Sequence, residues 1–131
     1  APTDWARWAG DGDRTLQDAL GRRSTRRPAL LHIDYHPMNV LTDGRTITGV
    51  LDWSNAQGGD PRADVARTYS ILMVEPIVPG RQPLVVSLVR RLFTWGWRRG
   101  YAAVGGALVG MPWFYAWAGE VMARGLAPRV S

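Results

Sequence analysis

Segments that can form β-strands are short, few and confined to the middle of this chain. Residues 29–33 form an apolar run that is too short for a stable helix and predicts a buried extended segment. The apolar pairs at 40–41 and 50–51 flank Asp43 and Gly44, a pattern typical of a β-hairpin. We therefore expect a mostly helical fold with one small hairpin.

Helix signals lie on both sides of this central part. Residues 15–18 resemble a capping box and predict a short helix that runs to Gly21. Asp60 followed by Pro61 is a strong helix start, because Asp can cap free N–H groups and Pro fits the first helical position. This start predicts a helix from Pro61 to about Val74, followed by a Pro-rich break.

Helical spacing resumes at Leu84, and we expect the helices that complete the chain to divide near Pro112. Two sets of apolar residues at this spacing are expected to form core faces: Leu88, Leu92 and Trp95, and Trp113 with Trp117.

Composition excludes several classes of protein. The 131 residues amount to about one domain, and their 46% hydrophobic content can bury a modest core. The absence of cysteine excludes disulfides, thiolate metal sites and cysteine nucleophiles. All 16 basic residues are arginine, so any chemistry that needs a lysine must be supplied from elsewhere.

Charge is distributed unevenly along the chain. Residues 28–80 carry three arginines against six acidic residues, whereas residues 81–131 carry seven arginines against one glutamate. The acidic cluster is either a solvated surface or a site for a cation. The arginine pairs at 90–91 and 98–99 are most simply a solvated helix face, with an acidic substrate or an anionic surface as alternatives.

Two features bear on targeting. The N-terminus lacks a basic head with an apolar run, and it also lacks an initiator methionine, so we expect a cytoplasmic fragment of a longer protein. Residues 100–119 are uncharged and long enough to span a bilayer, but five Gly, five Ala and Pro112 argue against a membrane span.

One short segment carries the chemistry. His32, Asp34 and Asn39 have the spacing H-x-D-x-x-x-x-N, and Asp52 follows thirteen residues after Asn39. Phosphoryl transfer needs one carboxylate to steer the attacking hydroxyl, and an amide oxygen with a second carboxylate to hold Mg²⁺. Asp34 fits the first task, and Asn39 with Asp52 fits the second.

The hairpin register decides whether these residues can meet. A tight turn at residues 43–44 pairs Asn39 with Thr48 and leaves Asp52 about 13 Å away at strand rise. A second register sets Asn39 opposite Asp52 and leaves residues 44–47 as a four-residue loop. We predict the second register, because two ligands of one Mg²⁺ must lie within roughly 4 Å of each other.

From residues 29 to 66 the sequence resembles the aminoglycoside phosphotransferase and choline kinase family, the small-molecule branch of the protein-kinase-like fold. The resemblance implies that Asp34 is the catalytic aspartate, that Asn39 and Asp52 bind the metal, and that His32 supports the loop. Gly59-Asp60-Pro61 with Asp64 is similar to a structural segment of the family.

The sequence departs from this family in two ways. Ser54 stands at a position that is often acidic, which bears on how the metal loop is braced. The family's nucleotide lobe, with its lysine, should precede this region, yet only 28 residues come before Ala29. We therefore expect residues 1–131 to be a partial C-terminal lobe, with its loops within 29–66 and a helical remainder at 67–131, that binds nucleotide poorly and is inactive alone.

Each of these residues also has a purely structural explanation. Asp34 could cap a turn near Pro37, and Asn39 alone would be a turn residue. Asp60 and Asp64 are expected to be structural, as a helix cap and an internal acceptor. His36 either faces the substrate or packs on the loop, and we leave it out of the predicted site.

The resemblance implies a kinase that uses Mg²⁺ and ATP or GTP to phosphorylate a hydroxyl on an aminoglycoside, an amino alcohol or a sugar-like acceptor, with antibiotic resistance as a possible role. The expected partners are this small molecule and the missing nucleotide lobe, and neither nucleic acid nor a membrane. The alternative is a binding module, either an inactive kinase-like lobe or an Arg-rich binder of anions or nucleic acid.

Overall fold

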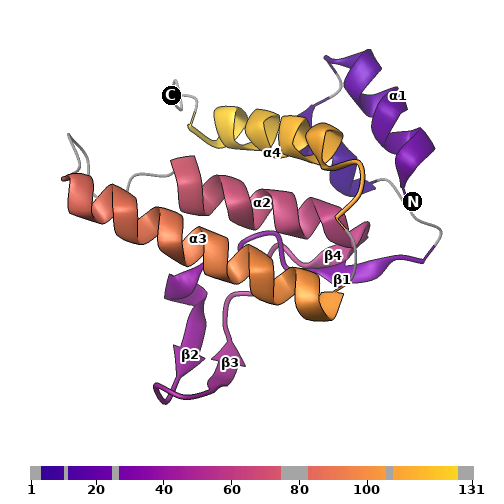
Figure 1. The fold of residues 1–131 in the computed structure, drawn as a ribbon. Coiled ribbons are helices and arrows are strands. Elements are labelled where there is room, and N and C mark those ends of the chain that lie inside the picture. The colour runs from indigo at the N-terminus through magenta and orange to yellow at the C-terminus, as the bar shows by residue number, and fades with distance from the viewer. Residues whose placement is uncertain (1–3, 11, 25–26, 75–82, 106–107, 127–131) are drawn as a thin grey trace, which may run out of the picture.

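Three long helices form the larger part of the described secondary structure. The computed structural model describes residues 4–10, 12–24, 27–74, 83–105 and 108–126. Its long helices are α2 (Pro61–Val74), α3 (Leu84–Gly105) and α4 (Met111–Leu126). Helix α2 lies between the other two and contacts both (Figure 1). A short 3₁₀ helix, η1 (Asp4–Ala9), and α1 (Arg14–Arg23) pack against α4.

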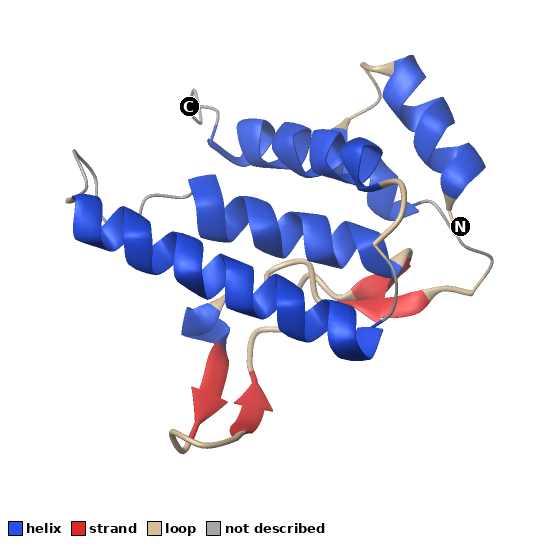
Figure 2. Ribbon diagram, viewed as in Figure 1, coloured by secondary structure: helices blue, strands red, loops and turns tan. Residues whose placement is uncertain are grey.

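The strands form two small antiparallel pairs (Figure 2). β2 (Val40–Thr42) and β3 (Ile47–Val50) form the predicted hairpin, which follows the 3₁₀ turn η2 (Pro37–Asn39). β1 (Ala29–Leu31) pairs with β4 (Gln57–Gly59). The prediction of a mostly helical fold with one small hairpin is confirmed, but the pairing of β1 with β4 was not predicted. Gln-Gly-Gly has little intrinsic strand preference, so β4 forms only because β1 lies beside it.

The hairpin register differs by one residue from the predicted one. Val40 pairs with Val50, and the backbone N–H of Leu51 donates to the carbonyl of Asn39 at 2.7 Å. Asn39 therefore lies opposite Leu51 and not opposite Asp52. An irregularity after Leu41 shifts the ladder, and such a bulge leaves little trace in the apolar pattern.

The predicted helix starts agree with the structure in one case and differ in the other. Helix α2 begins at Pro61 and ends at Val74, as expected. The N-terminal helix begins at Arg14, and its cap is Asp13, whose carboxylate accepts from the backbone N–H of Leu16 at 2.9 Å. The capping box predicted at residues 15–18 is thus wrong, because a better acceptor precedes it.

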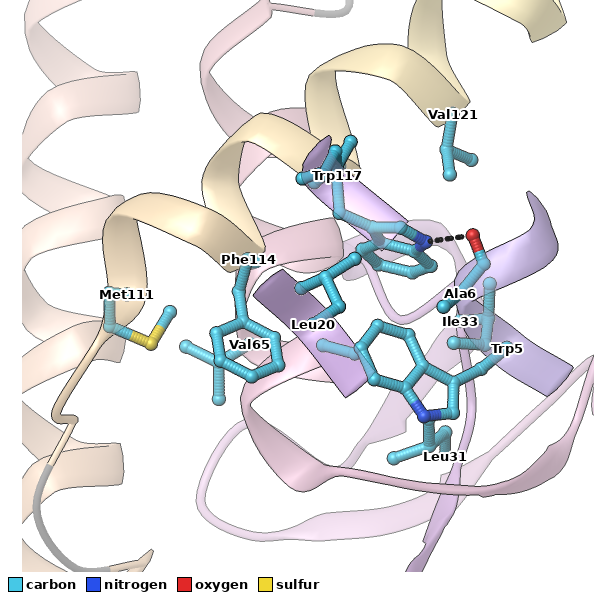
Figure 3. Close-up of a cluster of buried hydrophobic side chains, with 14 residues drawn as sticks. Trp5, Ala6, Leu20, Leu31, Ile33, Val65, Met111, Phe114, Trp117 and Val121 are labelled. Atoms are coloured by element: carbon cyan, nitrogen blue, oxygen red, sulfur yellow. Dashed lines mark hydrogen bonds between the residues drawn. The ribbon is translucent and has the colours of Figure 1, made fainter. Parts of the chain in front are cut away.

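The core lies where α4, α2 and η1 meet β1 (Figure 3). Trp5 and Trp117 are fully buried and pack edge to face, with ring centroids 5.1 Å apart. The Trp117 indole N–H donates to the carbonyl of Ala6 at 3.2 Å, which satisfies the buried polar atom. Trp113 packs against this core while partly exposed, so the prediction for Trp113 and Trp117 is confirmed.

The core face predicted for α3 is wrong. Leu88, Leu92 and Trp95 are 58%, 59% and 61% exposed. Instead Thr94 is buried, and Trp97 and Tyr101 pack against the core. The predicted set and the observed set both have helical spacing. Since α3 carries apolar residues on most of its sides, periodicity alone does not show which side is buried.

Residues 100–119, whose length alone would suffice for a bilayer, belong to α3, α4 and the connection between them. Within the described ranges, no helix is long and apolar enough to cross a membrane.

Gly59 has no room for a side chain. A Cβ at this position would clash with the Trp5 ring and come within 2.7 Å of the Leu31 side chain. Because Trp5 is buried and cannot swing away, we expect Gly59→Ala to lower the free energy of unfolding by about 1–3 kcal/mol. Urea unfolding followed by tryptophan fluorescence measures this loss.

Gly58→Ala is the matched control, because the adjacent glycine is exposed and a Cβ there meets nothing within 4 Å. Equal stability losses for the two variants would show that the Trp5 contact is not the cause.

Candidate active site

The loop that follows β1 is tied to α2 by one carboxylate. Asp64, in the first turn of α2, accepts from the backbone N–H groups of His32 at 2.9 Å and Ile33 at 2.8 Å. Ile33 is buried and has φ of 71°, a conformation that is unfavourable for a β-branched residue. The expectation that Asp64 is an internal acceptor is thus confirmed. Its hydrogen bond with Ile33 holds a strained backbone conformation at the residue before Asp34.

The His32 ring joins this loop to the segment after β3. Its Nδ1 accepts from the backbone N–H of Asp34 at 3.1 Å, and its Nε2 lies 2.8 Å from the carbonyl of Leu51. An accepting Nδ1 and a donating Nε2 define a neutral ring of one tautomer. The supporting role expected of His32 agrees with these two contacts.

Asp34 and Asn39 lie together. The Asn39 amide nitrogen donates to the Asp34 carbonyl at 2.9 Å and to its carboxylate Oδ2 at 3.3 Å. His36 Nε2 lies 3.5 Å from Asp34 Oδ1 and 3.3 Å from the Asn39 amide nitrogen. His36 is therefore a member of this cluster, which the sequence left undecided.

Asp52 lies close to the cluster through its backbone, but its side chain is held separately. Leu51 is paired with Asn39, and Asp52 follows it with φ of 58°. The Ser54 hydroxyl donates to Asp52 Oδ1 at 2.6 Å. The structure thus brings the side chains of Asp34 and Asn39 together, whereas no hydrogen bond among the described residues joins Asp52 to either.

The donor set suits a hard cation. Because Asn39 donates through its nitrogen, its Oδ1 remains available as a ligand. The exposed Asp52 adds carboxylate oxygen, and Mg²⁺ prefers oxygen ligands while keeping several waters. The described residues contain no group of three or more His, Cys, Asp or Glu that would hold a metal by themselves. Any ion here would therefore share its coordination with water or substrate.

A cleft of about 550 Å³ adjoins the loop. Its walls come from the loop, the hairpin, α2 and α3, and include Tyr35, His36, Thr68, Phe93 and Trp97. No sequence signal marks these residues as neighbours, since they are assembled from four separate segments. Leu92, which was predicted to lie in the core, also lines this cleft.

Comparison with known proteins identifies the family. Residues 2–102 match the model of the phosphotransferase enzyme family. The chain belongs to this family. Hygromycin-B 4-O-kinase of Escherichia coli is 48% identical over 40 residues, which are 30% of this chain and 12% of that relative. No solved structure matches the chain.

Membership in the phosphotransferase enzyme family confirms the resemblance to aminoglycoside phosphotransferases. The fold agrees with this membership, because mainly helical structure with small antiparallel sheets is compatible with part of a kinase-like domain. The aligned segment covers only a small part of the curated kinase, so the similarity does not establish the substrates of the present chain.

Ser54 controls the ionisation of Asp52. Two hydrogen bonds from Ser54 lower the pKa of the Asp52 carboxyl. The one from the hydroxyl has the larger effect, and the one from the backbone N–H has the smaller. A lowered pKa keeps the carboxylate ionised, and able to bind a cation, further into acid than an ordinary aspartate. We expect Ser54→Ala to raise the Asp52 pKa, so that the carboxylate is protonated at a higher pH as the solution is acidified.

An NMR titration of the Asp52 carboxyl carbon measures this shift. Thr46→Ala is a suitable control, because Thr46 donates to the carboxylate of Asp43 on the hairpin loop and not to Asp52. An Asp52 titration that is identical with and without the Ser54 hydroxyl would contradict the prediction.

Proposed function

We propose that this chain carries the catalytic loop of a small-molecule kinase, which transfers the γ-phosphoryl group of ATP or GTP to a hydroxyl of its acceptor. Family membership supports the reaction class. The observation that carries the proposal is the ordered Asp34 carboxylate, which Asn39 and His36 contact beside the 550 Å³ cleft.

In this proposal, Asp34 orients the acceptor hydroxyl and accepts its proton. A carboxylate suits this role because it can only accept hydrogen bonds when ionised. Its backbone N–H is fixed by His32, and its carboxylate contacts the Asn39 amide, so few of its own torsions remain free. A hydroxyl that enters from the cleft beside Tyr35 and His36 would meet it there.

Asn39 and Asp52 are proposed to hold Mg²⁺ through oxygen atoms. When bound, the ion would neutralise charge on the transferred phosphoryl group. The Asn39 side chain would then link two parts of the site, because its nitrogen contacts the Asp34 carboxylate and its oxygen would bind the metal. Asp52 would supply negative charge to this site, and the hydrogen bonds from Ser54, which lower its pKa, extend its ionised range further into acid.

The acceptor is proposed to be an aminoglycoside, an amino alcohol or a sugar-like molecule. The cleft combines aromatic and aliphatic walls with a few polar groups, as small-molecule sites do. The similarity to hygromycin-B 4-O-kinase makes hygromycin B the first acceptor to test, and would give the protein a role in antibiotic resistance. These 131 residues contain no lysine, so we propose that the lysine that grips the phosphates in related kinases is supplied by a nucleotide lobe outside them.

The test is transfer of labelled phosphate from ATP or GTP to a panel of acceptors by the protein that carries this chain. We expect transfer to at least one hydroxylated acceptor, abolished by EDTA and restored by Mg²⁺. No transfer to any of them, together with binding of nucleic acid that weakens steeply with salt, would instead support a binding module.

A further inference from the structure

A second cleft lies along α3, separate from the candidate active site. It encloses about 440 Å³ between α2, α3 and Leu108. On α3 its residues include positions 91, 95, 98 and 102, whose spacing of three or four places them on one side of the helix. The active-site cleft uses positions 92, 93, 96 and 97 of α3, and the two clefts share no lining residue.

This second cleft is strongly cationic. Its lining includes Arg91, Arg98 and Arg99, and the described residues that line it include no acidic one. Helix α3 as a whole carries four arginines and neither Asp nor Glu. Among the described residues, no ion pair neutralises the three lining arginines, so their charges add in one small volume.

Aromatic rings hold two of these guanidinium groups in place. Arg98 lies over the rings of Tyr69 and Tyr115, at 5.1 and 5.9 Å from their centroids. Arg99 lies over the ring of Trp95 at 5.3 Å. Stacking occupies the flat face of a guanidinium and leaves its N–H edge free to donate to oxygen atoms in two parallel bonds.

Part of the remaining wall is apolar. Met73, Ala102 and Leu108 line the cleft beside the arginines. Its volume falls within the range of small-molecule sites, roughly 300–1,000 Å³. A ligand that fits both features has a compact anionic group at one end and an apolar body at the other.

We propose that this cleft binds a small phosphate monoester with an apolar or aromatic body. Its phosphate oxygens accept from Arg91, Arg98 and Arg99, and its body lies against Met73 and Leu108. Phosphate is the favoured anion because its two charges and three terminal oxygens match several guanidinium forks at once. This site is independent of the proposed kinase reaction, since it shares no residue with the loop that carries Asp34.

Isothermal titration of the intact chain with phenyl phosphate tests the proposal, in EDTA so that no metal occupies the candidate active site. Inorganic phosphate and phenol serve as the two halves of the probe. We expect one saturable site for phenyl phosphate, weaker binding of inorganic phosphate and none of phenol. No saturable binding of phenyl phosphate, or binding that the two halves reproduce equally, would overturn the proposal.

Variants locate the site. Arg91→Gln and Arg98→Gln should each weaken phenyl phosphate about tenfold, because each removes a charge-assisted contact. Arg91 is exposed and stacks on no described ring, so its variant separates loss of binding from loss of folding. Arg22→Gln, an exposed site on α1, is the control of equal charge and should bind normally.

Equal weakening by Arg22→Gln would show that only net charge matters and would refute a built site. Loss of binding in Asp34→Asn, with Arg91→Gln unaffected, would place the ligand at the catalytic loop and refute it as well. Binding to phosphatidic acid vesicles in preference to phenyl phosphate would show that the arginines serve a membrane surface instead.

Discussion

Asp34→Asn is expected to lower turnover by about 10²–10⁴-fold while the affinity for nucleotide stays nearly constant. The substitution preserves the shape of the side chain, and its amide oxygen can still accept from Asn39, which now donates to the carboxylate at 3.3 Å. In the proposed mechanism, the substitution removes the ability to take a proton from the acceptor hydroxyl. Steady-state kinetics with the best acceptor of the panel, together with nucleotide binding measured directly, separate these two effects.

Asp18→Asn is the matched control, because this aspartate is exposed on α1 and makes no contact with the loop. Turnover should be unchanged in this variant. Full turnover in Asp34→Asn would remove Asp34 from the mechanism, whereas a loss of nucleotide affinity equal to the loss of turnover would point to a binding role.

Arg62→Met is expected to lower the free energy of unfolding by about 3–5 kcal/mol. Asp60 is 2% exposed, and Arg62 donates to its Oδ1 at 3.0 Å and to its Oδ2 at 2.7 Å. The hydrogen bond to Asp60 raises the Arg62 pKa further above neutrality. The guanidinium also donates to the carbonyls of Val109 and Arg23, which are exposed, so the cost of its loss is expected mainly at the buried Asp60 carboxylate.

Chemical denaturation measures this loss, and a double variant identifies its cause. Combining Arg62→Met with Asp60→Asn removes the charge of the buried carboxylate, so the double variant should be more stable than Arg62→Met alone. Arg22→Met, at an exposed arginine, should leave stability nearly unchanged. If the double variant were less stable than Arg62→Met, the buried Asp60 charge would not be the source of the destabilisation.

The sequence predicted those parts of the fold that depend on neighbouring residues. The Asp60-Pro61 start of α2 is an example, because the cap and the first turn are adjacent in the chain. Other features depend on distant segments. β4 exists through pairing with β1, and the exposed side of α3 was chosen by its contact with α2, which no periodicity records.

The candidate site shows the same division. The closeness of Asp34 and Asn39 was predictable, since they share one short loop. The place of Asp52 was not, because it depends on an irregular ladder and on a positive φ at Asp52 itself. The cleft beside the loop was equally hidden, because α2, α3 and the hairpin each supply one wall.

The hydrogen bonds from the loop to Asp64 link the proposed catalytic role of the loop to the docking of α2. The backbone at Ile33 would relax to an ordinary extended conformation if nothing held it, and what holds it is a side chain of α2. We therefore expect Asp34 to reach the position proposed for it in catalysis only when α2 is docked on β1. We expect partial unfolding of α2 to break these hydrogen bonds and displace Asp34 before the rest of the molecule unfolds.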